Sequence, residues 1–175
     1  PFMVDDPTGD PLFSFTYPYK TSTNNGVSWS VMTNGVVNFP KGTYWMRFHR
    51  GIFEDDGILY APVYVSFAEF TGSPRCVLLQ SVDGVTWNYK SDICPPGAGQ
   101  AEVENKDKGY NEVSVAICAN GDYLAVFREG HKIQYPLKYT RSTNKGVSWT
   151  APAYLTGLGG ATIAGNHPWH DDGNE

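Results

Sequence analysis

One short segment occurs three times in this chain, at residues 22–29, 81–87 and 142–149. The first and third copies share the pattern Ser-Thr-Asn-x-Gly-Val-Ser-Trp. The second is one residue shorter but keeps Ser, Asp, Gly, Thr and Trp in the same order. The tryptophans that close the copies are 58 and 62 residues apart. Such a near-constant period indicates a repeated structural unit, and it constrains the fold more than any other feature of the sequence.

The residue types in each copy predict a tight turn. Asn, Asp and Gly tolerate the left-handed backbone that hairpin turns need. Ser and Asp side chains hydrogen-bond nearby backbone amides and hold a turn closed. The closing tryptophan is large and mostly apolar, so we expect it to pack against a neighbouring layer. We therefore interpret the three copies as structural turns and not as catalytic segments.

Between the turns the sequence consists of short apolar runs that are typical of β-strands, with almost no helix pattern. In the middle unit we expect strands at 48–53, 58–67, 76–80 and 86–89. In the next unit we expect strands at 112–118, 123–128 and 137–141, with a fourth from Ser148. Four antiparallel strands per repeat describe the blade of a β-propeller.

This pattern divides the chain into parts of blades. The expected parts are the end of one blade at 1–40, a blade at 41–90, a long surface loop at 91–110, a blade at 111–155 and the start of another at 156–175. The loop is rich in Pro, Gly and charged residues. Loops on one rim of a propeller often build its functional site.

Charge and hydropathy exclude several partners. The 175 residues carry a net charge of −5 and no run of Lys and Arg, which argues against nucleic acid and anionic membrane surfaces. No apolar stretch reaches the roughly 18 residues of a membrane span. No signal peptide opens the chain, and its last residues resemble the beginning of another repeat. We therefore expect a fragment of a longer protein.

The chain offers no metal or cofactor motif. Its three cysteines lack the CxxC spacing of zinc and redox sites. Cys118 lies in an apolar pattern and is expected to be a buried thiol, whereas Cys76 and Cys94 flank one hairpin and could pair in an exported protein. His167 and His170 are three residues apart but have no third ligand nearby, so no metal is expected.

The three segments resemble the Asp-box, also called the BNR repeat, of sialidases and related propellers. The family pattern S-x-D-x-G-x-T-W lies at the turn between the third and fourth strands of a blade. The resemblance implies an all-β fold, a six-bladed propeller of four-stranded antiparallel blades, of which this chain is a segment of about three blades. The Asp-box is specific for this fold and carries little information about function.

A second resemblance concerns function. Residues 111–115 and 120–128 resemble the sialidase segment that carries a site glutamate and, one hairpin later, an arginine. Here these are Glu112 and Arg128, and the Asn-Gly turn between them would bring both to the same end of adjacent strands. The resemblance implies that Arg128 belongs to a triad that grips the sialic acid carboxylate. It implies that Glu112 accepts the proton of a tyrosine nucleophile.

A third resemblance is to the preceding sialidase blade, on residues 49–52 and 59–64. It implies that Tyr64 faces the glycan, and Arg50 is a further candidate for substrate binding. The remaining members of the family's catalytic set are an acid/base aspartate, the nucleophilic tyrosine and two more arginines. We expect all of them outside this chain.

Together these resemblances imply a sialidase-like retaining glycoside hydrolase that cleaves a terminal sialic acid or related acidic sugar without a cofactor. Its partner would be a glycan, and its location would be secreted, periplasmic or lumenal. Two alternatives remain open: an Asp-box glycosidase acting on a neutral sugar, such as an exo-arabinanase, and a propeller that binds glycans or proteins without catalysis. Arg128 and Glu129 could also form a plain surface ion pair.

Overall fold

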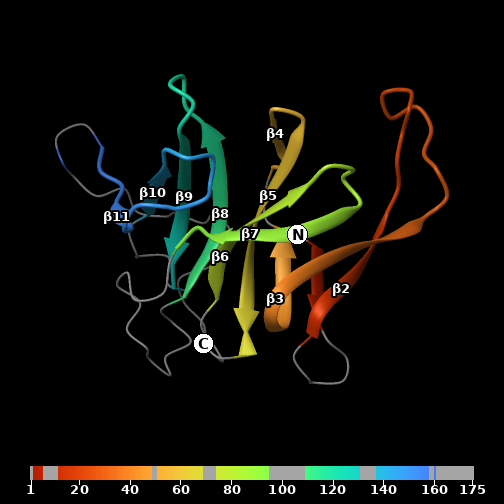
Figure 1. Cartoon of the computed structure of the whole chain (residues 1–175), viewed down its shortest axis with the longest axis horizontal. Coiled ribbons are helices and arrows are strands. Elements are labelled where there is room, and N and C mark those ends of the chain that lie inside the picture. The colour runs from red at the N-terminus through yellow and green to blue at the C-terminus, as the bar shows by residue number, and fades with distance from the viewer. Residues whose placement is uncertain are drawn as a thin grey trace, which may run out of the picture.

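The computed structural model describes residues 2–5, 12–48, 51–68, 74–94, 109–130, 137–157 and 160. The described residues form two β-sheets (Figure 1). The strands are β1 (Phe2–Asp5), β2 (Leu12–Tyr19), β3 (Thr33–Phe48), β4 (Phe53–Asp55), β5 (Ile58–Phe67), β6 (Arg75–Ser81), β7 (Thr86–Asp92), β8 (Tyr110–Ile117), β9 (Tyr123–Glu129), β10 (Lys138–Ser142) and β11 (Ala153–Tyr154). No helix in this part of the chain is long and apolar enough to cross a membrane.

The four-stranded sheet has the order β11-β10-β9-β8, in which every neighbouring pair is antiparallel. Consecutive strands are therefore neighbours in space, as in a propeller blade. The predicted Asn120-Gly121 turn joins β8 to β9, with Gly121 at φ +84°. Figure 1 shows this sheet beside the larger one.

The seven-stranded sheet contains a second meander, β5-β6-β7, whose strands are antiparallel. The strand that precedes β5 in this unit is split, because β3 and β4 both pair with β5, through Phe48↔Val63 and Phe53↔Tyr60. The prediction of one strand over 48–53 is therefore wrong. Gly51 has φ +73° and Ile52 is exposed, so the chain leaves the strand between the two pieces.

Strand β3 runs through the expected blade boundary at residues 40 and 41. Its first half pairs with β2 and, in parallel, with β7, whereas its second half pairs with β5 and β1. Pro40 lies between the two halves, where no ladder hydrogen bond is needed from its nitrogen. The strand thus joins the first unit to the middle unit without a loop.

Two hydrophobic clusters lie on opposite faces of the β3 and β5 strands. Met46 and Phe48 belong to the cluster between the first and middle units, together with Trp87. Trp45 belongs to the cluster that joins the middle unit to the four-stranded sheet. Because side chains alternate along β3, residues 45 and 47 lie on one face of the strand and residues 46 and 48 on the other.

The prediction of tight turns at the three repeated segments is confirmed. In the third copy, Ser142 Oγ accepts a hydrogen bond from Gly146 N at 2.8 Å, and Asn144 Oδ1 accepts one from Ser148 N at 2.9 Å. The first copy has the same two bonds at the same lengths. In the second copy, Asp83 Oδ1 accepts from the amides of residues 85 and 86, both at 2.8 Å.

The cysteines differ from expectation in one respect. Cys118 is half-buried in the turn after β8, where its amide donates to Asp122 O at 2.7 Å, so it is not a buried strand residue. Cys76 and Cys94 are buried free thiols. Burial and the adjacent Cys76 thiol raise the pKa of Cys94. His167 and His170 lie outside the described residues.

Candidate functional site

Glu112 and Arg128 lie at one end of the four-stranded sheet, near the start of β8 and the end of β9. The register passes from Asn111↔Arg128 to Ser114↔Val126, so residues 112 and 113 form a β-bulge. Glu112 has φ +51°, in the left-handed region. A bulge redirects side chains, and a left-handed non-glycine residue costs about 1–3 kcal/mol, so both features point to a functional position.

The bulge brings the two side chains into contact. Arg128 Nη1 lies 2.8 Å from Glu112 Oε1, and the side chains are 12% and 22% exposed. Glu129 pairs instead with Lys138 Nζ at 2.9 Å. The alternative of an Arg128–Glu129 surface pair is therefore wrong.

Tyr64 connects this pair to the middle unit. It lies on β5, is only 8% exposed, and packs edge-on against Trp45 with ring centroids 5.8 Å apart. The Arg47 side chain hydrogen-bonds Tyr64 and stacks over Trp45 at 5.5 Å. Arg47 and Tyr64 are direct cross-strand neighbours. Arg47 and Glu112 thus act on a buried tyrosine, and Arg128 pairs with that same Glu112.

The electrostatics of the cluster keep Tyr64 protonated. Burial raises its pKa, while the Arg47 hydrogen bond opposes that rise and the Glu112 charge adds to it. Burial therefore favours the neutral phenol, which can both donate and accept a hydrogen bond.

The structure brings Glu112, Arg128 and Tyr64 together, whereas Arg50 and its neighbour His49 lie outside the described residues. The sequence analysis missed Arg47 and Trp45. A signal for them was present, since residues 45 and 47 alternate with apolar Met46 and Phe48. The expected strand over 48–53 obscured that alternation because it placed Arg50, not Arg47, in the strand.

Metal binding finds no support in the described part of the chain. There, no group of three His, Cys, Asp or Glu side chains could hold a metal ion. The site chemistry available to these residues is hydrogen bonding, charge pairing and proton acceptance by Glu112.

The fold and the three turns define the class of protein: an all-β chain that forms part of a β-propeller with a repeated turn. The model of the BNR repeat-like domain family matches residues 5–158, and the chain belongs to this family. No curated protein matches the sequence.

Three solved structures share the fold. An alpha-L-arabinanase from Penicillium chrysogenum, complexed with arabinobiose, has a TM-score of 0.59 and 14% identity over 88% of this chain and 44% of its own. A protein of unknown function from Dyadobacter fermentans has a TM-score of 0.57 and 22% identity over 78% of this chain and 37% of its own. An intramolecular trans-sialidase from Ruminococcus gnavus, in complex with oseltamivir carboxylate, has a TM-score of 0.53 and 19% identity over 79% of this chain and 26% of its own. The chain thus spans less than half the length of each.

Proposed function

We propose that the protein carrying this chain is a sialidase-type retaining glycoside hydrolase that releases a terminal sialic acid or related acidic sugar. The observation that carries the proposal is the ion pair of Glu112 with Arg128, together with Arg47 across the buried Tyr64. A guanidinium that a carboxylate holds in a fixed orientation is suited to bind the carboxylate of an acidic sugar. A glycan substrate also implies an exported protein, in the periplasm, a lumen or the medium.

Arg128 would bind the carboxylate of the sugar. A planar guanidinium forms two parallel hydrogen bonds with a carboxylate, and its partial burial strengthens them. The ion pair with Glu112 holds the guanidinium in a fixed orientation before substrate arrives. Tyr64 and Arg47 form the adjacent wall, where Tyr64 can donate a hydrogen bond to the glycan.

Glu112 would act as the proton acceptor of a tyrosine nucleophile contributed by residues outside this chain. A phenol becomes a good nucleophile when a carboxylate takes its proton as it attacks the anomeric carbon. The glycosidic bond breaks, the leaving alcohol takes a proton from an acid, and water later releases the sugar with retained configuration. Sialidases follow this route instead of the two-carboxylate scheme, because a neutral nucleophile is not repelled by the sugar carboxylate.

Two observations favour a second candidate, a glycosidase for neutral sugars. Glu112 already compensates the charge of Arg128, and the arabinanase has a higher TM-score than the trans-sialidase. In that case Glu112 would be one of two catalytic carboxylates, and Arg128 would only orient it. A propeller that binds glycans without catalysis would need neither role.

The test compares a fluorogenic sialoside with a fluorogenic arabinofuranoside, using the complete natural polypeptide. We expect turnover of the sialoside. Replacing Arg128 with Ala should raise KM by about 10- to 100-fold, because a charge-assisted bond contributes about 1.5–3 kcal/mol. Arg141→Ala is the matched control, since Arg141 pairs with Asp122 and is 46% exposed.

The variant Glu112→Gln tests the proposed role of Glu112 as a proton acceptor. It should lower kcat by about 10²- to 10⁴-fold with an unchanged fold, as expected for loss of a general base. Turnover of only the arabinofuranoside, with KM insensitive to Arg128→Ala, would replace the sialidase assignment by the second candidate. Full activity of Glu112→Gln would remove Glu112 from the mechanism.

A further inference from the structure

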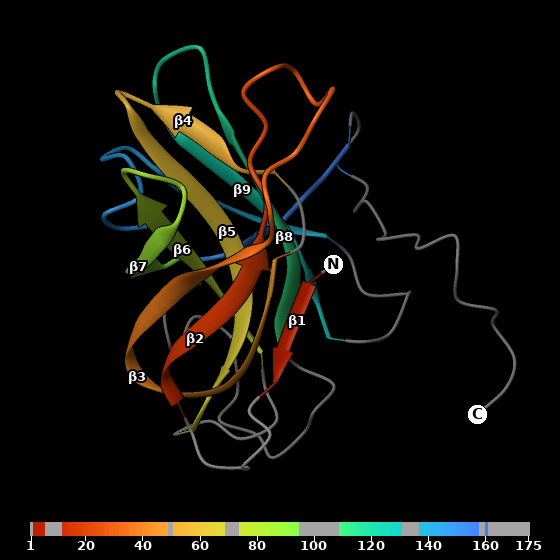
Figure 2. The same ribbon diagram turned by 90° about the vertical axis from the view of Figure 1, so that its right-hand side faces the viewer.

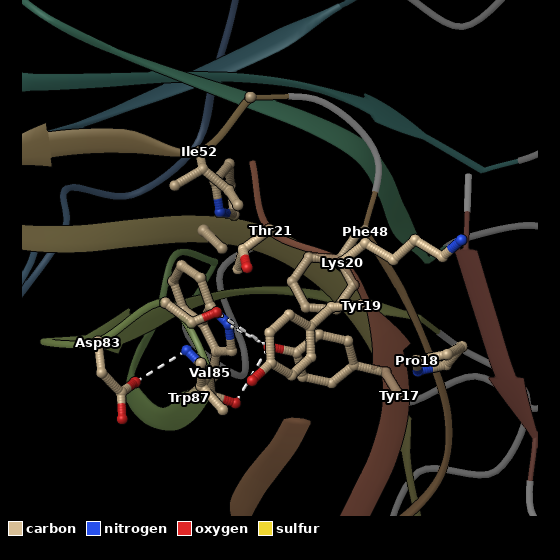
Figure 3. A pocket seen from close by; sticks show the side chains of 14 residues that line it. Tyr17, Pro18, Tyr19, Lys20, Thr21, Phe48, Ile52, Asp83, Val85 and Trp87 are labelled. Atoms are coloured by element: carbon tan, nitrogen blue, oxygen red, sulfur yellow. Dashed lines mark hydrogen bonds between the residues drawn. The ribbon is translucent and has the colours of Figure 1, made fainter. Parts of the chain in front are cut away.

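A pocket lies between the first unit and the middle unit, apart from the Glu112–Arg128 pair. Its volume is about 650 Å³, within the usual range of about 300–1,000 Å³ for small-molecule sites. Four aromatic rings line it, from β2, the end of β3 and the second Asp-box turn (Figure 3). These rings belong to Tyr17, Tyr19, Phe48 and Trp87.

The pocket and the ion pair are at opposite ends of the repeats. Arg128 lies near the end of β9, just before the connection to β10. The Asp-box turns follow the third strand of each unit, and they therefore lie at the opposite end of the strands. Tyr123 Oη donates to Asp55 Oδ2 at 2.6 Å, which joins the β4–β5 turn to the strand that follows the β8–β9 turn. Both of these turns stand at the upper edge in Figures 1 and 2.

A hydrogen-bond frame fixes the aromatic floor of the pocket. Trp87 Nε1 donates to Tyr17 Oη at 2.9 Å, and Tyr17 Oη in turn lies 3.0 Å from Val85 O and 3.1 Å from Gly84 O. Gly35 makes room for the tyrosine, because a Cβ there would meet the Tyr17 ring at 2.4 Å. The rings therefore hold their positions without a ligand, which reduces the entropy cost of binding.

Contacts between neighbouring rings extend this aromatic floor toward solvent. Centroids are 6.0 Å apart for Tyr17 and Tyr19, 6.1 Å for Tyr17 and Phe48, and 6.4 Å for Phe48 and Trp87. Trp87 is buried, whereas Tyr19 is half-exposed and its hydroxyl has no hydrogen-bond partner among the described residues. The wall thus offers an open aromatic face that ends in the Tyr19 hydroxyl.

Polar groups of opposite charge border the rings. Lys20 and Asp83 stand on opposite sides of them in Figure 3, and Thr21 adds a hydroxyl. Backbone amides of the Asp-box turn lower the pKa of Asp83, so this carboxylate is ionised and balances the lysine. A rim without excess charge has no preference for an anion.

An apolar platform with a polar, charge-balanced rim suits a sugar ring, whose C–H faces are apolar and whose edge carries hydroxyls. We propose that this pocket is a second carbohydrate-binding site, which takes one ring of a neutral glycan and holds it away from the Glu112–Arg128 site. It would retain a long glycan while another part of the same molecule reaches the catalytic residues. This binding is independent of the proposed reaction.

The test follows the Trp87 indole N–H resonance of the complete natural polypeptide by NMR, assigned by its loss in Trp87→Phe. Lactose, cellobiose and arabinobiose are the probes. At least one should shift this resonance saturably, with Kd on the order of 1–10 mM, as few contacts give weak binding. Tyr19→Ala should weaken it at least tenfold, and Tyr19→Phe by a smaller factor, because the ring remains.

Two controls separate this site from the catalytic one. Arg128→Ala should leave the affinity unchanged, and so should Tyr154→Ala, which removes an exposed tyrosine from the other sheet. The proposal is overturned if no probe shifts the resonance at about 50 mM. It is also overturned if Arg128→Ala abolishes the shift, or if 3′-sialyllactose binds here much more tightly than lactose.

Discussion

The first and third of the three repeated turns have nearly the same sequence and the same internal hydrogen bonds, but they differ in their surroundings. Asn25 and Lys145 occupy equivalent positions, and both have φ +54°. Yet Trp29 is 61% exposed, whereas Trp149 is half-buried and donates from Nε1 to Ser91 Oγ of the middle unit at 3.1 Å.

The second turn extends the comparison. Trp87 is 1% exposed and donates to Tyr17 of the first unit. Each of these two tryptophans therefore contacts the unit before its own. Within the described residues, the Trp29 indole has no hydrogen-bond acceptor. The comparison teaches that the motif builds its turn alone, while the use of its tryptophan depends on a neighbouring unit.

The largest expected effect tests this dependence directly. Trp87→Ala should lower the free energy of unfolding by about 3–5 kcal/mol, the usual cost of removing a buried aromatic side chain. Trp29→Ala is the matched control and should cost less than about 1 kcal/mol, because its ring is exposed. Urea unfolding of the chain measures both. Equal losses would show that the tryptophan acts within its own turn.

The next largest loss of stability is expected for substitutions of the turn glycines. A Cβ at Gly146 would lie 2.5 Å from buried Leu78 Cδ2, whereas at Gly26 it would meet only Trp29 Cζ2 at 3.7 Å. Both have positive φ, so alanine costs about 1–2 kcal/mol at each. Gly146→Ala should cost about 1–3 kcal/mol more through overpacking. Similar midpoints in urea for the two variants would mean that Leu78 moves aside freely.

Glu112 is the positive-φ residue that lies inside a strand and not in a turn. Glu112→Gly and Glu112→Ala both remove the carboxylate, but only glycine relaxes the left-handed backbone. We expect the glycine variant to be more stable by about 1–2 kcal/mol, as measured by thermal or urea unfolding. Neither variant should retain turnover. A more stable alanine variant would show that the bulge relaxes without the glutamate.

The smallest expected effect is on the stability of the fold at acidic pH. Asp55 accepts from Tyr123 Oη and pairs with Lys145 Nζ at 3.1 Å, and these two contacts lower its pKa. A lowered carboxyl pKa gives stability that is present above the unfolded value of about 4 and is lost as pH falls through the folded value. Lys145→Asn reproduces the first turn, which has Asn25, and should reduce the drop in urea midpoint between pH 6 and pH 3. An unchanged drop would exclude a contribution from this contact.

How far the sequence predicts the site can be seen at Arg47 and Arg50. The Asn-Gly turn correctly indicated that Glu112 and Arg128 end on adjacent strands, because hairpin pairing is local. The bulge that directs Glu112 toward Arg128 left no recognisable pattern. Arg47 was missed because the split between β3 and β4 depends on which strand each half meets.

The sequence by itself determined the three repeated turns, the strand-rich repeats and the hairpin that carries Glu112 and Arg128. Their hydrogen bonds join residues a few positions apart, so local residue types suffice to specify them. Only the tertiary structure decided which tryptophans are buried, that Arg47 meets Tyr64 near Glu112, and that aromatic rings of two units enclose a pocket. Those contacts join residues up to 70 positions apart, as for Trp87 and Tyr17, and depend on how whole units pack.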